Sequence, residues 1–194
     1  MLDSIPFIWR VILLLALMII VGGIDRVKNG SKATRIQEYG FILAAGVLGT
    51  LVAVGCDLFT SKLSPEYFTL GKGLSSEGLQ RQVITFGSKT GFSGGVIAGA
   101  VLLFSCGQHR PVWKTLYLRL WLPIVAAIAG GLLFPLVVSD YDPAHYFRQL
   151  NDLLTAEQIH HFRYVWWTHT GFYAGLIVGV ICLIFWNRHK SPLK

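Results

Sequence analysis

Two ionisable residues precede the same short motif in separate parts of the chain. Lys89 and His169 each stand before a Thr-Gly-Phe triplet, 80 residues apart. Asp57 and Asp140 each end an apolar stretch, and a cation at the start of a helix favours an anionic partner. We therefore expect Asp57 to pair with Lys89, and Asp140 with His169. Such pairs are either structural or form a site that binds a ligand or handles protons, since ionisable groups at membrane depth are often functional.

The segments after these two aspartates add further polar and aromatic side chains. Glu66 and Tyr67 follow Asp57, and Tyr146 follows Asp140 at a similar distance. The Tyr-Phe pair in each segment either folds inward as a cover or packs in the core or the membrane interface. The candidate binding residues are Asp57, Glu66, Tyr67, Lys89, Asp140, Tyr146 and His169.

Glu157, His160 and His161 form a weaker candidate for a metal site. Their spacing places the side chains on one helix face, and Glu-x-x-His is a metal-ligand spacing when two helices supply it. The segment after Asp57 holds no histidine, so a duplicated two-metal site is not expected, and a solvated or interfacial pair is the alternative. No G-x-S-x-G, H-E-x-x-H or P-loop motif is present, so the sequence identifies neither a catalytic residue nor a cofactor.

The composition indicates that membrane-spanning helices position these residues. Hydrophobic residues make up 53% of the 194 residues and charged residues only 14%, against about 25% in soluble domains. This composition argues against a cytosolic enzyme and against nucleic-acid binding. A spanning helix needs about 20 apolar residues. Five stretches approach this length: Ile5–Ile24, Tyr39–Cys56, Thr90–Cys106, Leu120–Val138 and Thr168–Trp186.

An internal repeat organises the chain. The segment that begins at Lys89 matches the one that begins at His169, and Leu-Ser-Ser-Glu at 74–77 matches Leu-Thr-Ala-Glu at 154–157. We therefore predict an all-α membrane protein with five transmembrane helices: one anchor helix and two tandem helix–outer loop–helix repeats of parallel topology. The predicted units are residues 1–37 (anchor helix and cytoplasmic loop), 38–115 (repeat 1) and 116–194 (repeat 2 and cytoplasmic tail). Each outer loop is expected to hold a short surface helix, and Thr155 to Gln158 fits a capping box.

Glycines recur at every fourth position in one stretch of each repeat. The two series are Gly91, Gly95, Gly99 and Gly171, Gly175, Gly179. Small residues at this spacing line one helix face and let a neighbouring backbone approach closely, as in G-x-x-x-G packing. We therefore expect these two helices to be inner helices in contact with each other. A glycine-lined permeation path is the alternative.

Basic residues divide unequally between the two sides of the predicted membrane protein. The loops after the first and third stretches and the C-terminal tail carry 10 Lys and Arg with two acidic residues, whereas the other side carries 7 with eight. Lys and Arg concentrate in cytoplasmic loops. The N-terminus and both long loops, residues 57–89 and 139–167, are therefore expected outside, and the C-terminus inside.

A helix that ends in Cys56-Asp57-Leu58-Phe59-Thr60 is followed by Ser64-Pro65-Glu66-Tyr67-Phe68-Thr69. This region, residues 40–105, resembles a group of small uncharacterised bacterial multi-span membrane proteins, which carry a similar Asp-x-x-Thr and S-P-E-Y-F-T element. The resemblance implies a bacterial inner (cytoplasmic) membrane protein and supplies no activity. The second copy differs, with Asp142-Pro143-Ala144-His145-Tyr146-Phe147, so a site built on Glu66 would be asymmetric.

Three functions remain open on the sequence alone. The favoured hypothesis is a non-enzymatic scaffold or accessory subunit whose outer loops bind another membrane protein or a lipid headgroup. It rests on the glycine-packed helices and on the lack of a catalytic motif. The second is a membrane-embedded enzyme that acts at the outer leaflet through Asp57, Glu66, Lys89 and His169. The third is a small transporter or channel, which parallel repeats favour and the lack of charge in mid-membrane opposes.

Overall fold

The chain is helical throughout the part that the structure describes. In this computed structural model the described residues are 6–106, 113–138, 141–142 and 146–189, and no strand occurs within these ranges. The predicted all-α class is therefore confirmed. The long helices are α1 (Phe7–Asn29), α2 (Arg35–Leu63), α3 (Leu79–Ser105), α5 (Trp121–Val138) and α6 (Ala156–His189). The shorter elements are η2 (Gly30–Lys32), η3 (Tyr67–Gly71), α4 (Trp113–Arg119) and η5 (Phe147–Leu150).

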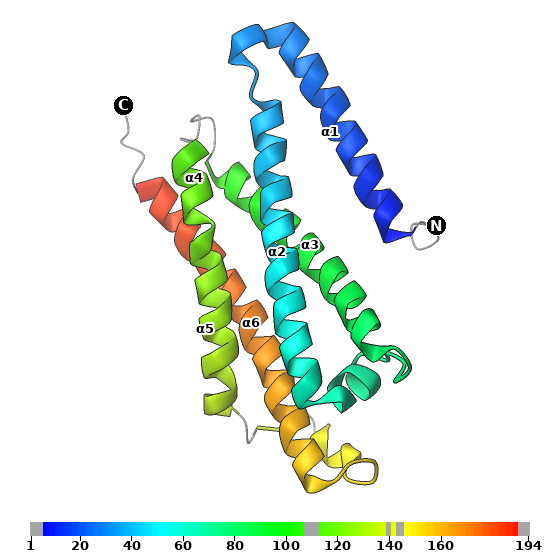
Figure 1. Cartoon of the computed structure of the whole chain (residues 1–194). Helices are drawn as coiled ribbons and strands as arrows, with labels where there is room; N and C mark the ends of the chain where they lie inside the picture. Colours follow the sequence, from blue (N-terminus) through cyan, green and yellow to red (C-terminus); the bar gives the residue numbers. More distant parts are fainter. Residues whose placement is uncertain (1–5, 107–112, 139–140, 143–145, 190–194) are drawn as a thin grey trace.

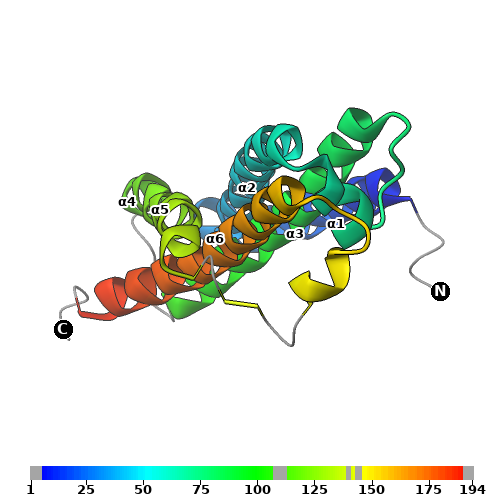
Figure 2. The ribbon, with the colours of Figure 1, turned by 90° about the horizontal axis from the view of Figure 1, so that it is seen from below.

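Two antiparallel helix pairs form the body of the molecule. The first hairpin consists of α2 and α3, and the second consists of α5 and α6 (Figure 1). Segments 64–78 and 146–155, which precede α3 and α6, lie at the same end of the molecule, opposite the α1–α2 connection (Figure 1). The two hairpins lie side by side in both views (Figure 1, Figure 2). Helix α1 runs at an angle to α2 (Figure 1), and its Phe7 ring contacts Phe92 of α3 with the centroids 5.9 Å apart.

Four helical segments are long and apolar enough to cross a membrane. Within the described ranges they are Phe7–Lys32, Arg35–Leu63, Trp113–Val138 and Ala156–Trp186. Helix α3 has 27 residues, or about 40 Å of helix, which is also long enough to span. It falls outside this group because Lys89 and the glycines and serines that follow lower its hydropathy. The structure therefore supports four of the five predicted spans by length and composition.

Helix α6 begins earlier than the predicted span. The Thr155 amide donates to Gln158 Oε1 at 2.9 Å, and the Gln158 amide donates to Thr155 Oγ1 at 3.3 Å, so the predicted capping box is confirmed. From this cap the helix runs for 34 residues, and no proline or glycine interrupts residues 156–170, between the cap and the apolar stretch. The separate surface helix expected in the second loop is therefore the first part of α6. As a result, His169 lies inside a helix and not at its first turn, and Lys89 likewise lies inside α3.

Each of the six glycines in the two series faces the partner helix of its own hairpin. A Cβ atom added at any of them would lie closer than 3.0 Å to an atom of that helix, so the backbones can approach only because these positions are glycine. The close approaches at these glycines therefore lie within the hairpins, and α3 and α6 are also in contact with each other, as the sequence predicted. The facing pairs are Gly91 with Gly49, Gly95 with Ala45, Gly99 with Ala45, Gly171 with Gly130, Gly175 with Ala126 and Gly179 with Pro123.

Two apolar clusters join the hairpins at opposite ends. The cavity described below lies between the two hairpins, in the region that separates these two clusters. The cluster near the loops contains Tyr67, Phe68, Val83, Phe147, Leu150, Ile159, Phe162, Val165 and Trp167. The cluster at the other end contains Phe41, Ala45, Leu102, Leu116, Leu120, Val180 and Leu183.

Candidate functional site

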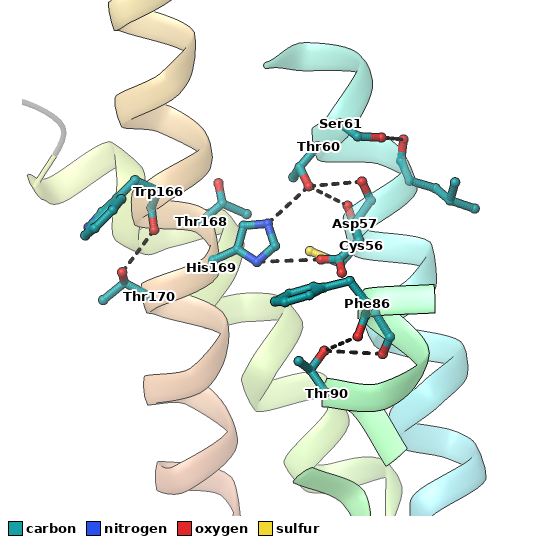
Figure 3. Close-up of polar contacts among 12 residues, drawn as sticks. Cys56, Asp57, Thr60, Ser61, Phe86, Thr90, Trp166, Thr168, His169 and Thr170 are labelled. Atoms are coloured by element: carbon teal, nitrogen blue, oxygen red, sulfur yellow. Dashed lines mark hydrogen bonds and ion pairs between the residues drawn. The ribbon is translucent and has the colours of Figure 1, made fainter. Parts of the chain in front are cut away.

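An aspartate and a histidine from different hairpins meet inside the bundle. Asp57 of α2 and His169 of α6 lie with Oδ1 and Nδ1 3.7 Å apart. The two residues are only 4% and 6% exposed. Figure 3 shows the His169 ring directed from α6 toward α2. A buried charge is costly without a partner, so each side chain lowers the free-energy cost of burying the other. We refer to this pair as the Asp57–His169 dyad.

Thr60 holds the other nitrogen of the histidine ring. Its Oγ1 lies 3.2 Å from His169 Nε2 and donates a hydrogen bond to the Cys56 carbonyl oxygen at 2.8 Å (Figure 3). A hydroxyl group has one proton to donate, so Thr60 accepts a hydrogen bond from the N–H of Nε2. This assignment leaves Nδ1 facing Asp57.

Tyr67 and Phe68 cover the dyad from the first loop. The Tyr67 ring stacks on the His169 ring with the centroids 4.9 Å apart, and Phe68 meets the same ring edge-on at 5.9 Å. Both aromatic side chains are buried, so this pair folds inward and also packs in the core. Burial raises the pKa of the Tyr67 phenol, which therefore stays neutral.

Lys72 adds a cation to the same loop. Its Nζ lies 5.3 Å from the centre of the Tyr67 ring and 5.6 Å from that of Phe86. Burial lowers the pKa of the Lys72 ammonium group, and the negative charge of Asp57 acts in the opposite direction. Lys72 therefore contributes positive potential on the loop side of the dyad.

The expected Asp57–Lys89 pair is wrong. No ion pair joins the two among the described side chains, and Lys89 is exposed beside a surface pocket. Helix α3 faces Asp57 with Gly87, where an added Cβ atom would lie 2.7 Å from Asp57 Oδ2. Position 89 is turned by roughly 200° from position 87, which directs Lys89 away. Asp140, the partner expected for His169, lies outside the described residues, and His169 pairs with Asp57 instead.

Glu66 and Tyr146 lie next to Tyr67 and Phe68, which cover the dyad, and not at the dyad itself. Glu66 accepts hydrogen bonds from Gln158 Nε2 at 2.9 Å and from Ser64 Oγ at 3.2 Å, which ties the first loop to α6. The Tyr146 ring packs against Trp166 with the centroids 5.1 Å apart. Of the candidate binding residues, the structure thus brings together Asp57, Tyr67 and His169.

The potential metal ligands of Glu157, His160 and His161 are not the ones that lie close enough together to bind one ion. The two histidine rings lie 6.0 Å apart, and Glu157 and His160 are exposed. Within the described part of the chain, the side chains that could share one ion are those of Cys56, Asp57 and His169, whose ligand atoms all lie within 4.8 Å of one another. The Glu-x-x-His spacing therefore does not identify the residues that lie close enough to share an ion.

A cavity extends from the dyad between the two hairpins. Its volume is about 110 Å³, and α2, α3, α5 and α6 all contribute to its wall. Cys56, Asp57 and His169 border one end, and Leu102 and Leu120 border the other. Most of the remaining wall consists of glycine, alanine and aliphatic side chains. We call this space the inter-hairpin cavity: a narrow apolar space with polar groups at one end.

Three residues of this site, Cys56, Thr60 and Lys72, are not among the candidates predicted from the sequence. Cys56 and Thr60 lie on either side of Asp57 within one turn of α2, and Cys-Asp-x-x-Thr places polar groups on one helix face. That pattern is the signal that could have identified the first two. Lys72 carries no comparable signal, because its position depends on how the loop folds back over Tyr67.

The chemistry of the site follows from its own residues. The dyad can donate and accept hydrogen bonds in a buried place, the inter-hairpin cavity can hold an apolar group, and Cys56 adds a thiol. Comparison with known proteins adds no family to this description: no protein-family model, curated protein or solved structure matches the chain.

Proposed function

We propose that the chain is an integral membrane protein that binds an amphipathic small molecule in the inter-hairpin cavity, without transforming it. The observation that carries the proposal is the form of this space, an apolar cavity of about 110 Å³ that ends at the Asp57–His169 dyad. Ligand pockets typically combine mostly apolar walls with a few convergent polar groups. The cavity has this composition, with its polar groups at one end.

The size and charge of the cavity define the class of ligand. A cavity of about 150 Å³ can hold benzene, so this smaller space of about 110 Å³ admits a short segment of one hydrocarbon chain. The dyad favours a head group without net charge, because one proton held between Asp57 Oδ1 and His169 Nδ1 leaves the pair without net charge, and a further buried charge would have no partner. A lipid or isoprenoid that places a hydroxyl or carbonyl head and the few adjoining carbons in the cavity belongs to this class.

Gly94→Leu is expected to remove the bound molecule. Gly94 lines the cavity and an added Cβ atom there meets nothing within 4 Å, so the leucine fills the cavity without forcing helices apart. The measurement is mass spectrometry of the apolar compounds that copurify with equal amounts of protein. We expect one compound to be enriched over bulk lipid in the wild type and depleted at least about tenfold in the variant, which corresponds to about 1.4 kcal/mol.

Gly55→Leu is the matched control for this experiment. Gly55 also has open space around it, but it does not line the cavity, so the same substitution should leave the compound in place. The proposal fails if no compound is enriched with the wild-type protein, or if both variants retain it equally.

One observation favours a second function, an enzyme that acts on the bound molecule. Thr60, His169 and Asp57 form the sequence hydroxyl, imidazole and carboxylate, with spacings of 3.2 and 3.7 Å. Nucleophilic hydrolases use the same order of groups. Binding remains the better-supported function because Thr60 directs its proton to the Cys56 carbonyl and not to His169. The apolar cavity wall gives less support to a transporter or channel.

We further infer that α3 is the fifth span and that the two hairpins are duplicated copies of parallel topology. Helix α3 pairs along α2, which itself has the length and hydropathy of a span. The contacts also recur: Gly91 faces Gly49 as Gly171 faces Gly130, at offsets of 80 and 81 residues. Contact at such small-residue positions is the G-x-x-x-G mode of membrane helix packing.

We expect a bacterial inner membrane with the N-terminus and both long loops outside. Ser76 and Lys114 are exposed and lie on opposite sides in this arrangement. Single cysteines at these positions, in a chain whose three native cysteines are serine, test it with a membrane-impermeant thiol reagent on intact cells. Ser76→Cys should be labelled at once, and Lys114→Cys only after lysis. The reverse pattern would contradict the orientation.

A further inference from the structure

We propose that Cys56, Asp57 and His169 form a binding site for a divalent transition metal of the zinc class. The sulfur of Cys56, a carboxylate oxygen of Asp57 and a ring nitrogen of His169 lie within 4.8 Å of one another. Figure 3 shows the Cys56 sulfur beside the Asp57 carboxylate, with the His169 ring facing both. Thiolate, carboxylate and imidazole are the groups that Zn²⁺ takes as ligands in proteins.

The hydrogen bonds around the histidine direct a lone pair to this point. Thr60 donates to the Cys56 carbonyl at 2.8 Å and therefore accepts the Nε2–H of His169 at 3.2 Å. With the proton on Nε2, a neutral imidazole turns the lone pair of Nδ1 toward Asp57. Metal-binding histidines are commonly held in this way, through the nitrogen that does not bind the metal. Thr60 is thus the positioning residue of the site.

The distance between Asp57 and His169 fits two ligands of one ion. Oδ1 and Nδ1 are 3.7 Å apart, which is too long for a hydrogen bond. Ligands bound at about 2.0–2.3 Å to a tetrahedral zinc ion lie about 3.3–3.8 Å from each other. A carboxylate oxygen and a nitrogen lone pair repel each other unless a cation lies between them. A proton could bridge these two atoms, but the Cys56 sulfur adds a third donor, which favours a metal ion.

The charges of the three ligands also suit a buried divalent ion. The thiolate and the carboxylate carry one negative charge each and the imidazole carries none, so a doubly charged cation gives a neutral site. A neutral site avoids the cost of net charge at membrane depth. The inter-hairpin cavity reaches all three residues, so the fourth position of a tetrahedral ion is left for a water or another oxygen ligand.

This inference does not rest on the proposed amphipathic ligand. Metal binding needs the Cys56 sulfur, whereas the amphipath needs the open cavity. Gly94→Leu is therefore expected to keep the metal and lose the amphipath, and Cys56→Ser to do the reverse, so the failure of one proposal is distinguishable from the failure of the other.

Titration of the full-length, chelator-treated protein in detergent with Co²⁺ tests the site. Tetrahedral Co²⁺ bound to a thiolate gives an intense charge-transfer absorption in the near ultraviolet. We expect one equivalent of Co²⁺ to bind the wild type, with an absorption band that added Zn²⁺ removes. Cys56→Ser should lose the band and bind at least about tenfold more weakly, and Thr60→Val should keep the band with affinity about 10- to 100-fold lower.

Matched controls are available within the chain. Cys106→Ser with Cys182→Ser removes the other two thiols, and His160→Asn with His161→Asn removes the neighbouring histidine pair. Both double variants should keep the band and the affinity. Zn²⁺ should also raise the melting temperature of the wild type and the controls, and should raise that of Cys56→Ser by less. A cooperative melting transition of metal-free Cys56→Ser shows that this variant is folded. A band that persists in Cys56→Ser, or that is absent from the folded wild type, would overturn the proposal.

Discussion

His169→Leu is expected to lower the free energy of unfolding by about 3–5 kcal/mol in metal-free buffer. The substitution leaves the Asp57 carboxylate buried, only 4% exposed, without the imidazole 3.7 Å away. If the cause is the unpartnered charge, Asp57→Asn introduced together with His169→Leu should recover much of the loss. Reversible unfolding of the four proteins in mixed micelles gives the coupling energy, which we expect to reach at least about 1.5 kcal/mol.

Lys89 supplies the control for this double-mutant cycle. It is exposed and makes no ion pair with Asp57 among the described residues, so Lys89→Leu should cost little and should add to Asp57→Asn within about 0.5 kcal/mol. Strong coupling of Asp57 to Lys89, together with weak coupling to His169, would restore the pairing expected from the sequence and contradict the dyad.

Gly95→Leu and Gly175→Leu are each expected to lower the free energy of unfolding by about 3 kcal/mol. An added Cβ atom at Gly95 would meet the Ala45 carbonyl and lie 2.9 Å from the Gly46 Cα, and the rigid backbone cannot move aside as a side chain could. Gly175 faces the Ala126 backbone in the same way. The helices of the hairpin must therefore separate, with loss of the dispersion contacts that hold membrane helices together.

Gly94→Leu is a stringent control because it lies one residue away on the same helix. Nothing lies within 4 Å of its added Cβ atom, so the same increase in side-chain volume should change the free energy of unfolding by less than about 1 kcal/mol in delipidated detergent. A Gly95→Leu protein as stable as the Gly94→Leu protein would remove the argument for close helix contact.

Much of the fold could be predicted from local sequence. Apolar length indicates the long helices, and the capping box at Thr155 and Gln158 marks the start of α6 as the structure has it. The glycine spacing indicates that α3 and α6 each have a face for close contact. It does not specify the partner, because any neighbouring backbone can use such a face, and the partner proved to be the other helix of the same hairpin.

The candidate site was harder to predict because it joins the two hairpins. Asp57 and His169 are 112 positions apart, and nothing local indicates that α2 faces α6 at this depth. The repeat favoured pairs within each hairpin, yet rotation along α3 turns Lys89 outward and presents Gly87 to Asp57. His169 was also expected in the first turn of a helix because Thr168 was taken as the start of a span, whereas α6 begins 12 residues earlier.

The most direct test of the account is a density map of the wild-type protein in lipid nanodiscs, with a bound antibody fragment to supply mass. We expect an elongated density in the inter-hairpin cavity, with one end against Asp57 and His169 and the other toward Leu102 and Leu120. The same map of Gly94→Leu should show the two hairpins unchanged and that density gone. A wild-type map in which the hairpins close and their own side chains fill this space, or in which His169 turns away from Asp57, would contradict it.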